Sequence, residues 1–263
     1  MESKLHIPKT GPLRDRVIAI WQGIGNFNGR ETILPKGIVE IIFNYTRQTK
    51  GSFANELIIA PRCFIQGLNT QCLKVEYTGQ QNMLGVQLQR DKVKDILGVL
   101  PGEFNNRLVD LELINPHFGM LWHRLAEINS FEERVHVLEN SLPLISNQYC
   151  KRTAHLSQLF EGGRVDSFQS VDTLAREVCY STRQLSRISQ QLFGLAPEEL
   201  ISYKRFLQSV HLISHKNTSL TSIAYEAGYY DQAHFCRSFK SYAGMTAMQY
   251  KKQKSHLPFH IFS

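Results

Sequence analysis

The side chains with the most obvious chemical potential lie close together in the stretch AGYYDQAHFCRSFKSYAG, from Ala227 to Gly244. Cys236 and His234 are two residues apart and could in principle form a nucleophile and its general base. On a helix, however, residues two apart point about 200° away from each other. We therefore expect no catalytic residue here. Cys236 is expected to pack inside the protein, and His234 either to contact a partner or to face solvent.

The other metal-binding or nucleophilic residue types form no known site pattern. His117 and His123 are six residues apart beside Trp122, a spacing that puts no two ligands on one helical face, so packing or surface positions are expected. Five cysteines occur far apart and never as a CxxC pair: Cys63, Cys72, Cys150, Cys179 and Cys236. This usage is typical of reduced thiols and argues against a disulfide framework. The sequence therefore predicts no metal and no cofactor.

Charge separates the chain into two parts. Its 263 residues carry a formal net charge of +7 and suffice for two domains. Residues 1–150 hold 16 Lys and Arg against 15 Asp and Glu, whereas residues 151–263 hold 14 against 8. This excess predicts a polyanionic partner for the C-terminal part. No apolar run reaches the roughly 18 residues of a membrane span, and no signal peptide is recognisable, so a cytoplasmic protein is expected.

The two parts also differ in hydrophobic pattern. The first 90 residues favour short strands, such as Ile38 to Tyr45, and predict a small barrel or sandwich. After residue 90, apolar residues recur at three- and four-residue steps, which predicts helices packed on the β part: Leu121, Leu125, Ile128, Val135 and Leu138. Trp21 and its neighbouring aromatics could line a ligand cavity or form core. The stretch from Ser146 to Ser170 can hold a short helix, after which Gly162, Gly163 and the polar residues beside them favour a linker.

An internal repeat organises the last hundred residues. One copy begins at Leu174 (LAREVCYSTRQLSRISQQLFG) and the other at Ile223 (IAYEAGYYDQAHFCRSFKSYAG), offset by 49 residues at the start and by 50 after the turn. Ser170 and Ser219 suit the N-cap of a first short helix, and Ser181 and Asp231 that of a second. Each copy therefore predicts a helix-turn-helix, and the stretch that begins at Pro197 predicts a long linking helix.

The second helix of each copy has an apolar face and a long polar face. Apolar residues recur at helical spacing and should face the core: Leu185, Ile188, Leu192, Phe235 and Phe239. The opposite face carries no acidic residue but several that point outward: Arg183, Gln184, Ser186, Arg187, Gln190, Gln232, Ala233, His234, Arg237 and Lys240. Arg and Gln at such positions can read base edges in a major groove.

The duplicated unit resembles the DNA-binding region of AraC/XylS-family bacterial transcription regulators over about residues 160–253. Residues in register with the family pattern are Ile223, Ala224, Gly228, Tyr229, Phe235, Arg237, Phe239, Lys240, Gly244, Thr246 and Tyr250. The chain departs from the pattern at Ala247, where Pro is usual, at Ala196, where Ser or Thr caps the linking helix, and at Tyr230. The segment from Leu34 to Thr46 resembles the β-rich sensing domain of an uncharacterised subgroup of these regulators.

The resemblance implies two recognition helices in successive major-groove segments. The implied base contacts are Arg183, Ser186, Arg187, Gln232, Ala233, His234 and Arg237. The implied neighbours of the DNA backbone are Ser181, Asp231, Lys240 and Arg205; for Arg205, bracing of the two halves is the alternative. Tyr229 is expected in the core. No catalytic residue is implied.

We accordingly expect an α+β protein with four segments: a β-rich sensing or dimerisation domain (1–150), a linker (151–167), an all-α domain of two helix-turn-helix subdomains (168–254) and a tail (255–263). The expected function is an effector-responsive transcription activator in the bacterial cytoplasm, associated with the nucleoid. Expected partners are promoter DNA, RNA polymerase, a small-molecule effector and a second copy of the chain, with no membrane. Two alternatives stay open: a DNA-repair-type enzyme fused to a helix-turn-helix domain, and a protein-interaction module that reads no DNA.

Overall fold

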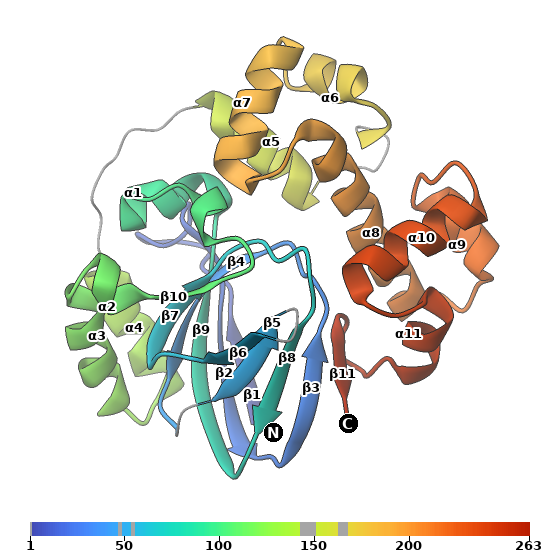
Figure 1. The fold of residues 1–263 in the computed structure, drawn as a ribbon. Coiled ribbons are helices and arrows are strands. Elements are labelled where there is room, and N and C mark those ends of the chain that lie inside the picture. Colours follow the sequence, from blue (N-terminus) through green and yellow to red (C-terminus); the bar gives the residue numbers. More distant parts are fainter. Residues whose placement is uncertain (1, 47–48, 54–55, 143–150, 163–167) are drawn as a thin grey trace.

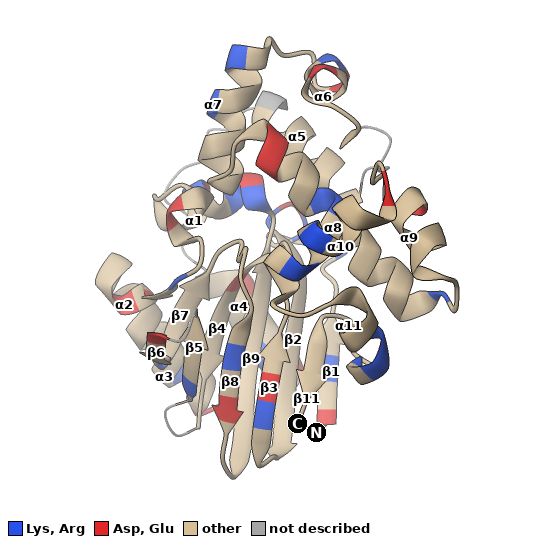
Figure 2. Ribbon diagram, turned by 45° about the vertical axis from the view of Figure 1, so that its right-hand side comes forward, with Lys and Arg blue, Asp and Glu red and all other residues tan. Residues whose placement is uncertain are grey.

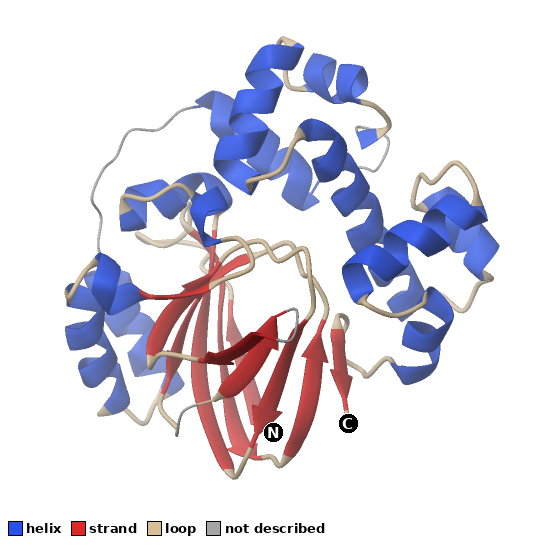
Figure 3. Cartoon of the chain, viewed as in Figure 1, coloured by secondary structure: helices blue, strands red, loops and turns tan. Residues whose placement is uncertain are grey.

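The N-terminal part of the computed structural model is a two-layer β-sandwich flanked by helices (Figures 1 and 3). The structure describes residues 2–46, 49–53, 56–142, 151–162 and 168–263. The strands of the sandwich are β1 (Glu2–His6), β2 (Val17–Asn26), β3 (Gly29–Ile33), β4 (Val39–Asn44), β5 (Lys50–Phe53), β6 (Glu56–Ile59), β7 (Cys63–Gln66), β8 (Leu73–Tyr77), β9 (Gln80–Leu88), β10 (Leu108–Asp110) and β11 (His260–Phe262). The sandwich and the mixed α+β class agree with the prediction.

All pairings between neighbouring strands are antiparallel. One sheet has the order β1-β2-β9-β4-β7-β10, and the other has the order β11-β3-β8-β5-β6. The predicted strand from Ile38 to Tyr45 is confirmed as β4, the fully buried central strand of the first sheet. Its odd-numbered side chains, Val39, Ile41 and Phe43, belong to the main hydrophobic core of this domain, which the six-stranded sheet shares with the helices that follow it. Ile42 instead packs in a small cluster with Phe64.

Short helices cover one face of the six-stranded sheet. They are η1 (Arg90–Lys92), α1 (Val93–Leu97), η2 (Pro101–Phe104), α2 (Leu111–Ile114), α3 (His117–Ala126) and α4 (Phe131–Ser141). Leu121, Leu125, Val135 and Leu138 are buried in the same cluster as β4, and Ile128 packs at its edge. The predicted packing of helices on the β part is therefore confirmed. His117 Nε2 donates to Ser141 O at 2.8 Å and Trp122 Nε1 donates to Asn44 O at 2.9 Å, which agrees with packing roles for both rings.

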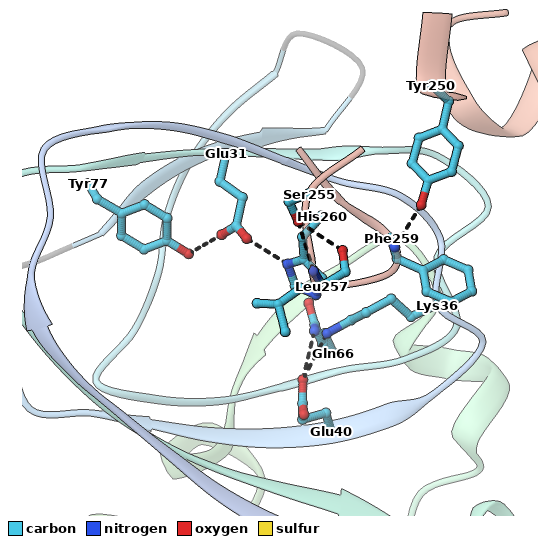
Figure 4. A network of polar contacts seen from close by, with 10 residues as sticks. All are labelled: Glu31, Lys36, Glu40, Gln66, Tyr77, Tyr250, Ser255, Leu257, Phe259 and His260. Carbon is cyan, nitrogen blue, oxygen red and sulfur yellow. Dashed lines mark hydrogen bonds and ion pairs between the residues drawn. The ribbon is translucent and has the colours of Figure 1, made fainter. Parts of the chain in front are cut away.

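A buried carboxylate lies in the six-stranded sheet. Glu40 accepts a hydrogen bond from Gln66 Nε2 (3.3 Å) and pairs with Lys36 at 3.7 Å (Figure 4). It also accepts a hydrogen bond from Trp21 Nε1 at 2.5 Å. A Cβ atom on Gly85 would lie 2.1 Å from the Trp21 ring, so glycine is required where the indole crosses β9. The structure thus gives Trp21 a packing and hydrogen-bonding role.

The C-terminal part is helical except for its last strand. Its helices are α5 (Lys151–Gly162), α6 (Val171–Glu177), α7 (Thr182–Phe193), α8 (Pro197–His215), α9 (Leu220–Glu226), α10 (Gln232–Ala243) and α11 (Ala247–Gln253). The predicted linking helix is α8, with Pro197 in its first turn. Helix α5 occupies most of the segment expected to be a linker, because Ala154, Leu156 and Phe160 bury an apolar face.

The segment 255–263, expected to be a tail, joins the N-terminal sandwich. Strand β11 pairs with β3, with Ile261 opposite Thr32. His260 Nδ1 lies 2.5 Å from Glu31 Oε1, and Tyr77 donates to the other oxygen of that carboxylate at 2.7 Å (Figure 4). Residues 260–262 therefore add an edge strand to the five-stranded sheet. None of the described helices contains an apolar stretch of the length that a bilayer span requires.

Candidate nucleic-acid interface

Two short helices, α6 and α9, begin the two repeats. Ser170 Oγ accepts from Thr173 N at 3.1 Å, and Ser219 Oγ accepts from Ser222 N at 3.1 Å, so both predicted N-caps are confirmed. Ala175 and Ala224 are both buried, as close helix packing requires. The turns that follow reach the left-handed region at Gly228 (φ 81°) and at its counterpart Cys179 (φ 55°).

Helix α7 begins with a complete capping box. Ser181 Oγ accepts from Gln184 N at 3.2 Å, and Gln184 Oε1 accepts from Ser181 N at 3.0 Å. Leu185 and Ile188 point into the core, so the helix is held by its apolar face. The predicted capping box and apolar face are both present.

The outer face of α7 carries the predicted reading residues. Arg183, Ser186 and Arg187 are exposed. Neither guanidinium group has a hydrogen-bond or ion-pair partner in the described part of the chain, and α7 contains no acidic residue (Figure 2). Ser186 Oγ donates to Thr182 O at 3.0 Å, which holds its hydroxyl against the helix. This surface offers unpaired donors to an outside acceptor.

Helix α10 has the same construction with other residues. Asp231 Oδ1 accepts from His234 N at 2.6 Å as the N-cap, and Phe235 and Phe239 are fully buried. Arg237 and Lys240 are exposed, and neither has a hydrogen-bond or ion-pair partner in the described part of the chain. The two helices therefore present equivalent polar faces on equivalent supports.

Three further predicted residues lie at the N-terminal end of α10. Gln232 is exposed and accepts from Thr221 Oγ1 at 2.8 Å, which ties α10 to α9. Ala233 is exposed, so its methyl group is available for apolar contact. The His234 ring is partly buried and meets Tyr229 edge-on at 5.2 Å between centroids. Tyr229 itself is buried, as predicted.

Cys236 is exposed, so the prediction that it packs inside the protein is wrong. It lies four residues after Gln232 and four before Lys240, so all three share one helical stripe. The small, apolar thiol suggested burial. The neighbouring Phe235 fills the core instead, and the helical period then turns Cys236 outward.

Arg205, expected near the DNA backbone or as a brace, is engaged inside the protein. Its Nη2 donates to Gln169 O at 2.8 Å and to Phe168 O at 3.4 Å, just before α6 begins. Burial lowers the pKa of its guanidinium. This geometry supports the bracing role, because the side chain links α8 to the first helix-turn-helix.

Among the described residues, one cluster of metal-ligand residue types lies on the sandwich, away from α7 and α10. The ligand atoms of Cys63, Asp110 and Glu112 lie within 4.8 Å of one another. Arg62 donates twice to Glu112, at 2.6 and 2.8 Å, and Asp110 caps α2. Burial raises the pKa of the Cys63 thiol to about 12. The cluster is thus a neutral thiol beside an ion pair, and its contacts are structural.

Comparison with known families separates the same two parts. Residues 174–253 match a helix-turn-helix domain family, and residues 6–110 match a domain of unknown function (DUF6597). An HTH-type transcriptional regulator of Haemophilus influenzae is 33% identical over 85 residues, covering 32% of this chain and 28% of the relative. The transcriptional activator RhaS of Escherichia coli is 35% identical over 69 residues, covering 26% of this chain and 25% of the relative.

The chain therefore spans about a quarter of the length of these curated relatives. Among solved structures, ToxT of Vibrio cholerae aligns over 89% of this chain and 98% of its own, with 12% identity and a TM-score of 0.47. A regulator of Chromobacterium violaceum with an AraC-type DNA-binding domain aligns over 40% and 92%, with 22% identity and a TM-score of 0.36. From the family match and the two sequence relatives, residues 174–253 are a helix-turn-helix domain similar to those of HTH-type transcriptional regulators.

Proposed function

We propose that the protein is a sequence-specific DNA-binding regulator of transcription. The observation that carries the proposal is the pair of exposed, acid-free faces on α7 and α10, with Arg183, Arg187 and Arg237 all unpaired within the described chain. An unpaired arginine on an exposed helix can bind guanine O6 and N7 with two hydrogen bonds. The two faces recur at equivalent repeat positions, as two half-sites on one DNA duplex would require.

The residues divide by the part of DNA that they would contact. Base edges are assigned to Arg183, Ser186, Arg187, Gln232, Ala233, His234 and Arg237, with the Ala233 methyl suited to the methyl of thymine. The backbone is assigned to Lys240 and to the N-terminal ends of the helices at Ser181 and Asp231, where free N–H groups meet phosphate. Arg205 supports this surface from α8 through Gln169.

The experiment is genome-wide mapping of bound sites for the full chain, together with transcript levels in its presence and absence. A regulator gives a shared motif upstream of genes whose transcripts change. We propose activation as the sign, as in the name of the RhaS relative. Promoter DNA, RNA polymerase, a second copy of the chain and a small-molecule effector are the partners that this function would involve, inside a bacterial cell.

We assign the small-molecule effector to the N-terminal domain, since the helix-turn-helix units of the C-terminal part are assigned to DNA. Between the two sheets lies a cavity of about 60 Å³ lined by apolar side chains with Asn44, Gln66 and Tyr77. Typical ligand pockets measure about 300–1,000 Å³. An effector larger than a few atoms would therefore not fit between the sheets as they stand. Calorimetry with candidate compounds tests this role.

Two alternatives give different results. A repair-type enzyme fused to a helix-turn-helix domain would bind stoichiometric zinc through thiolates, whereas the described thiols Cys63 and Cys72 both have a pKa raised to about 12 by burial. A metal assay on the purified chain decides this point. A protein-interaction module would bind DNA uniformly, with no enriched motif. We propose neither a reaction nor a cofactor for this chain.

A further inference from the structure

The N-terminal domain contacts the same position in both repeats. Phe193 and Ala243 are the last residues of α7 and α10 and lie 50 residues apart, at the offset of the repeat. Asn105 Nδ2 donates to Phe193 O at 2.5 Å, and Cys72 Sγ donates to Ala243 O at 3.1 Å. The last carbonyl groups of a helix have no partner within it, so they are open to outside donors. Both recognition helices are thus hydrogen-bonded at the C-terminal end by the N-terminal domain.

The two donors come from loops that are joined to each other. We call residues 67–72, together with residues 102–106 that include the end of η2, the clamp loops. Thr70 N donates to Asn106 Oδ1 at 2.8 Å, and Asn106 Nδ2 donates back to Thr70 Oγ1 at 2.9 Å. Gly67 N donates to Phe104 O at 3.1 Å. The clamp loops therefore form one unit between the two recognition helices.

The contact with α7 is close enough to be sensitive to a single methyl group. A Cβ atom on Gly102 would lie 2.9 Å from both Gln190 O and Gly194 N. A Cβ atom on Gly194 would lie 2.4 Å from Asn105 Nδ2, whereas at the equivalent Gly244 it would meet nothing within 4 Å. Backbone therefore packs on backbone at the end of α7.

The linking helix is held by the same unit. Tyr203, in the middle of α8, is fully buried and donates to Asn69 O at 2.8 Å. At the end of α10, burial raises the pKa of the Cys72 thiol to about 12, so this group stays a donor at neutral pH. The clamp loops thus contact α7, α8 and α10 together. These contacts add a second link between the two recognition helices, which are already joined covalently through α8.

We propose that Asn105 and Cys72 are positioning residues that fix the two recognition helices relative to each other, so that the N-terminal domain sets which half-site spacing the protein accepts. This inference rests on the proposed DNA-binding function. Each base pair inserted between half-sites moves the second one along and around the duplex, which repeats about every 10 base pairs. A fixed pair of helices tolerates little of this movement, whereas a pair joined by α8 alone tolerates more.

The test uses the full chain and duplexes that carry its selected site with one to about five base pairs inserted between the half-sites. The double variant Asn105→Ala/Cys72→Ala removes both donors, and Gly102→Ala separates the clamp loops from α7 while keeping every donor. Cys72→Ser retains a donor and is the conservative variant. Gly162→Ala is the matched control, because a Cβ there meets nothing within 4 Å.

We expect the wild type, the Cys72→Ser variant with Asn105 retained and the Gly162→Ala control to behave alike. For each of them, the affinity for DNA should fall sharply when base pairs are inserted between the half-sites. For the double variant and Gly102→Ala, the ratio of affinities between the best and the shifted sites should shrink by about tenfold, within the range of coupling between two sites. Base preferences inside each half-site should not change. Thermal unfolding verifies that each variant is folded.

Identical spacing profiles in the wild type and in both clamp variants would overturn the proposal and assign the spacing to α8 alone. A change in base preference without a change in spacing would also contradict it. Failure of the proposed function is distinguishable, because the wild-type chain would then enrich no motif at all. In that case no spacing profile exists to compare.

Discussion

At the scale of single residues, the arginines on the recognition faces should specify bases, and Lys240 should not. Arg187→Ala and Arg237→Ala should each relax selectivity at one position of their own half-site, at a cost of about 1–3 kcal/mol for the preferred base. Lys240→Ala should weaken binding to all sequences and lower the salt slope by about 1. Selection from randomised duplexes, repeated at several salt concentrations, measures both effects. Unchanged selectivity in both arginine variants would show that neither Arg187 nor Arg237 reads a base.

The two repeats share a left-handed backbone position but carry different residues there, which allows a test by exchange. Gly228 and Cys179 both have positive φ, where a side chain costs roughly 1–2 kcal/mol. Gly228→Ala should therefore lower the free energy of unfolding by about that amount. Cys179→Gly should change it by less than about 0.5 kcal/mol, because relieved strain offsets the greater freedom of glycine in the unfolded chain. Urea denaturation measures the pair, and equal losses at both positions would refute the reasoning.

Sequence reasoning predicted residue roles well where local structure determines them. The N-caps Ser181 and Asp231 and the inward Phe235 follow from helical period and hydrogen-bonding chemistry, and all three are confirmed. Cys236 and Arg205 depend on what surrounds them. A small thiol can be buried or exposed, and an arginine can bind phosphate or a carbonyl, so residue type alone did not decide either position.

At the scale of elements, α8 contains a buried amine whose titration should be visible. Lys204 is 8% exposed, and its Nζ donates to Phe160 O at 2.5 Å. Burial lowers the pKa of Lys204 to about 8, against 10.5 in the unfolded chain. Between these values the unfolded chain binds a proton that the folded chain lacks. Stability from this group therefore rises with pH across that window, by at most about 1.4 kcal/mol per pH unit.

The variant Lys204→Met isolates this group. Cysteines and tyrosines also titrate above pH 8, so the quantity to compare is the difference in the free energy of unfolding between wild type and variant. This difference should move in favour of the wild type as pH rises from 8 to 10. Parallel pH profiles for the two proteins would show that the amine is not desolvated in the folded chain.

The elements missed from the sequence are those defined by distant contacts. Strand β11 has three residues, and its pairing with β3 joins positions more than 220 residues apart, so no local pattern identifies it. Helix α5 was predicted only as a short helix ahead of a linker, because Gly162 and the polar residues beside it obscured the apolar face at Ala154, Leu156 and Phe160. Long, periodic elements such as α8 were predicted correctly.

At the scale of the whole molecule, the last strand should stabilise both domains together. Ile261 is 7% exposed and belongs to the same hydrophobic cluster as Leu34 and Leu68 of the sandwich and Tyr250 of α11. Ile261→Ala should cost about 2–5 kcal/mol of stability, as is usual for a buried isoleucine. Leu257→Ala, at a 45% exposed residue of the same segment, should cost less than about 0.5 kcal/mol.

Chemical denaturation followed by two probes tests this coupling. Because the cluster is shared, Ile261→Ala should lower the unfolding midpoint of the sandwich and of the helical domain together. A shift confined to the helical domain would mean that β11 contributes nothing to the sandwich. Removal of β11 should also expose the edge of β3, and unpaired strand edges promote association between chains.

The central claim is that two equivalent helices of one chain read two half-sites. The most direct measurement is the selection of binding sites by the full chain from a pool of randomised duplexes. The account predicts a bipartite motif whose halves lie about one helical turn, or 10 base pairs, apart, with one half altered by Arg187→Ala and the other by Arg237→Ala. A pool that stays random, or one undivided motif that changes in the same way in both variants, would contradict it.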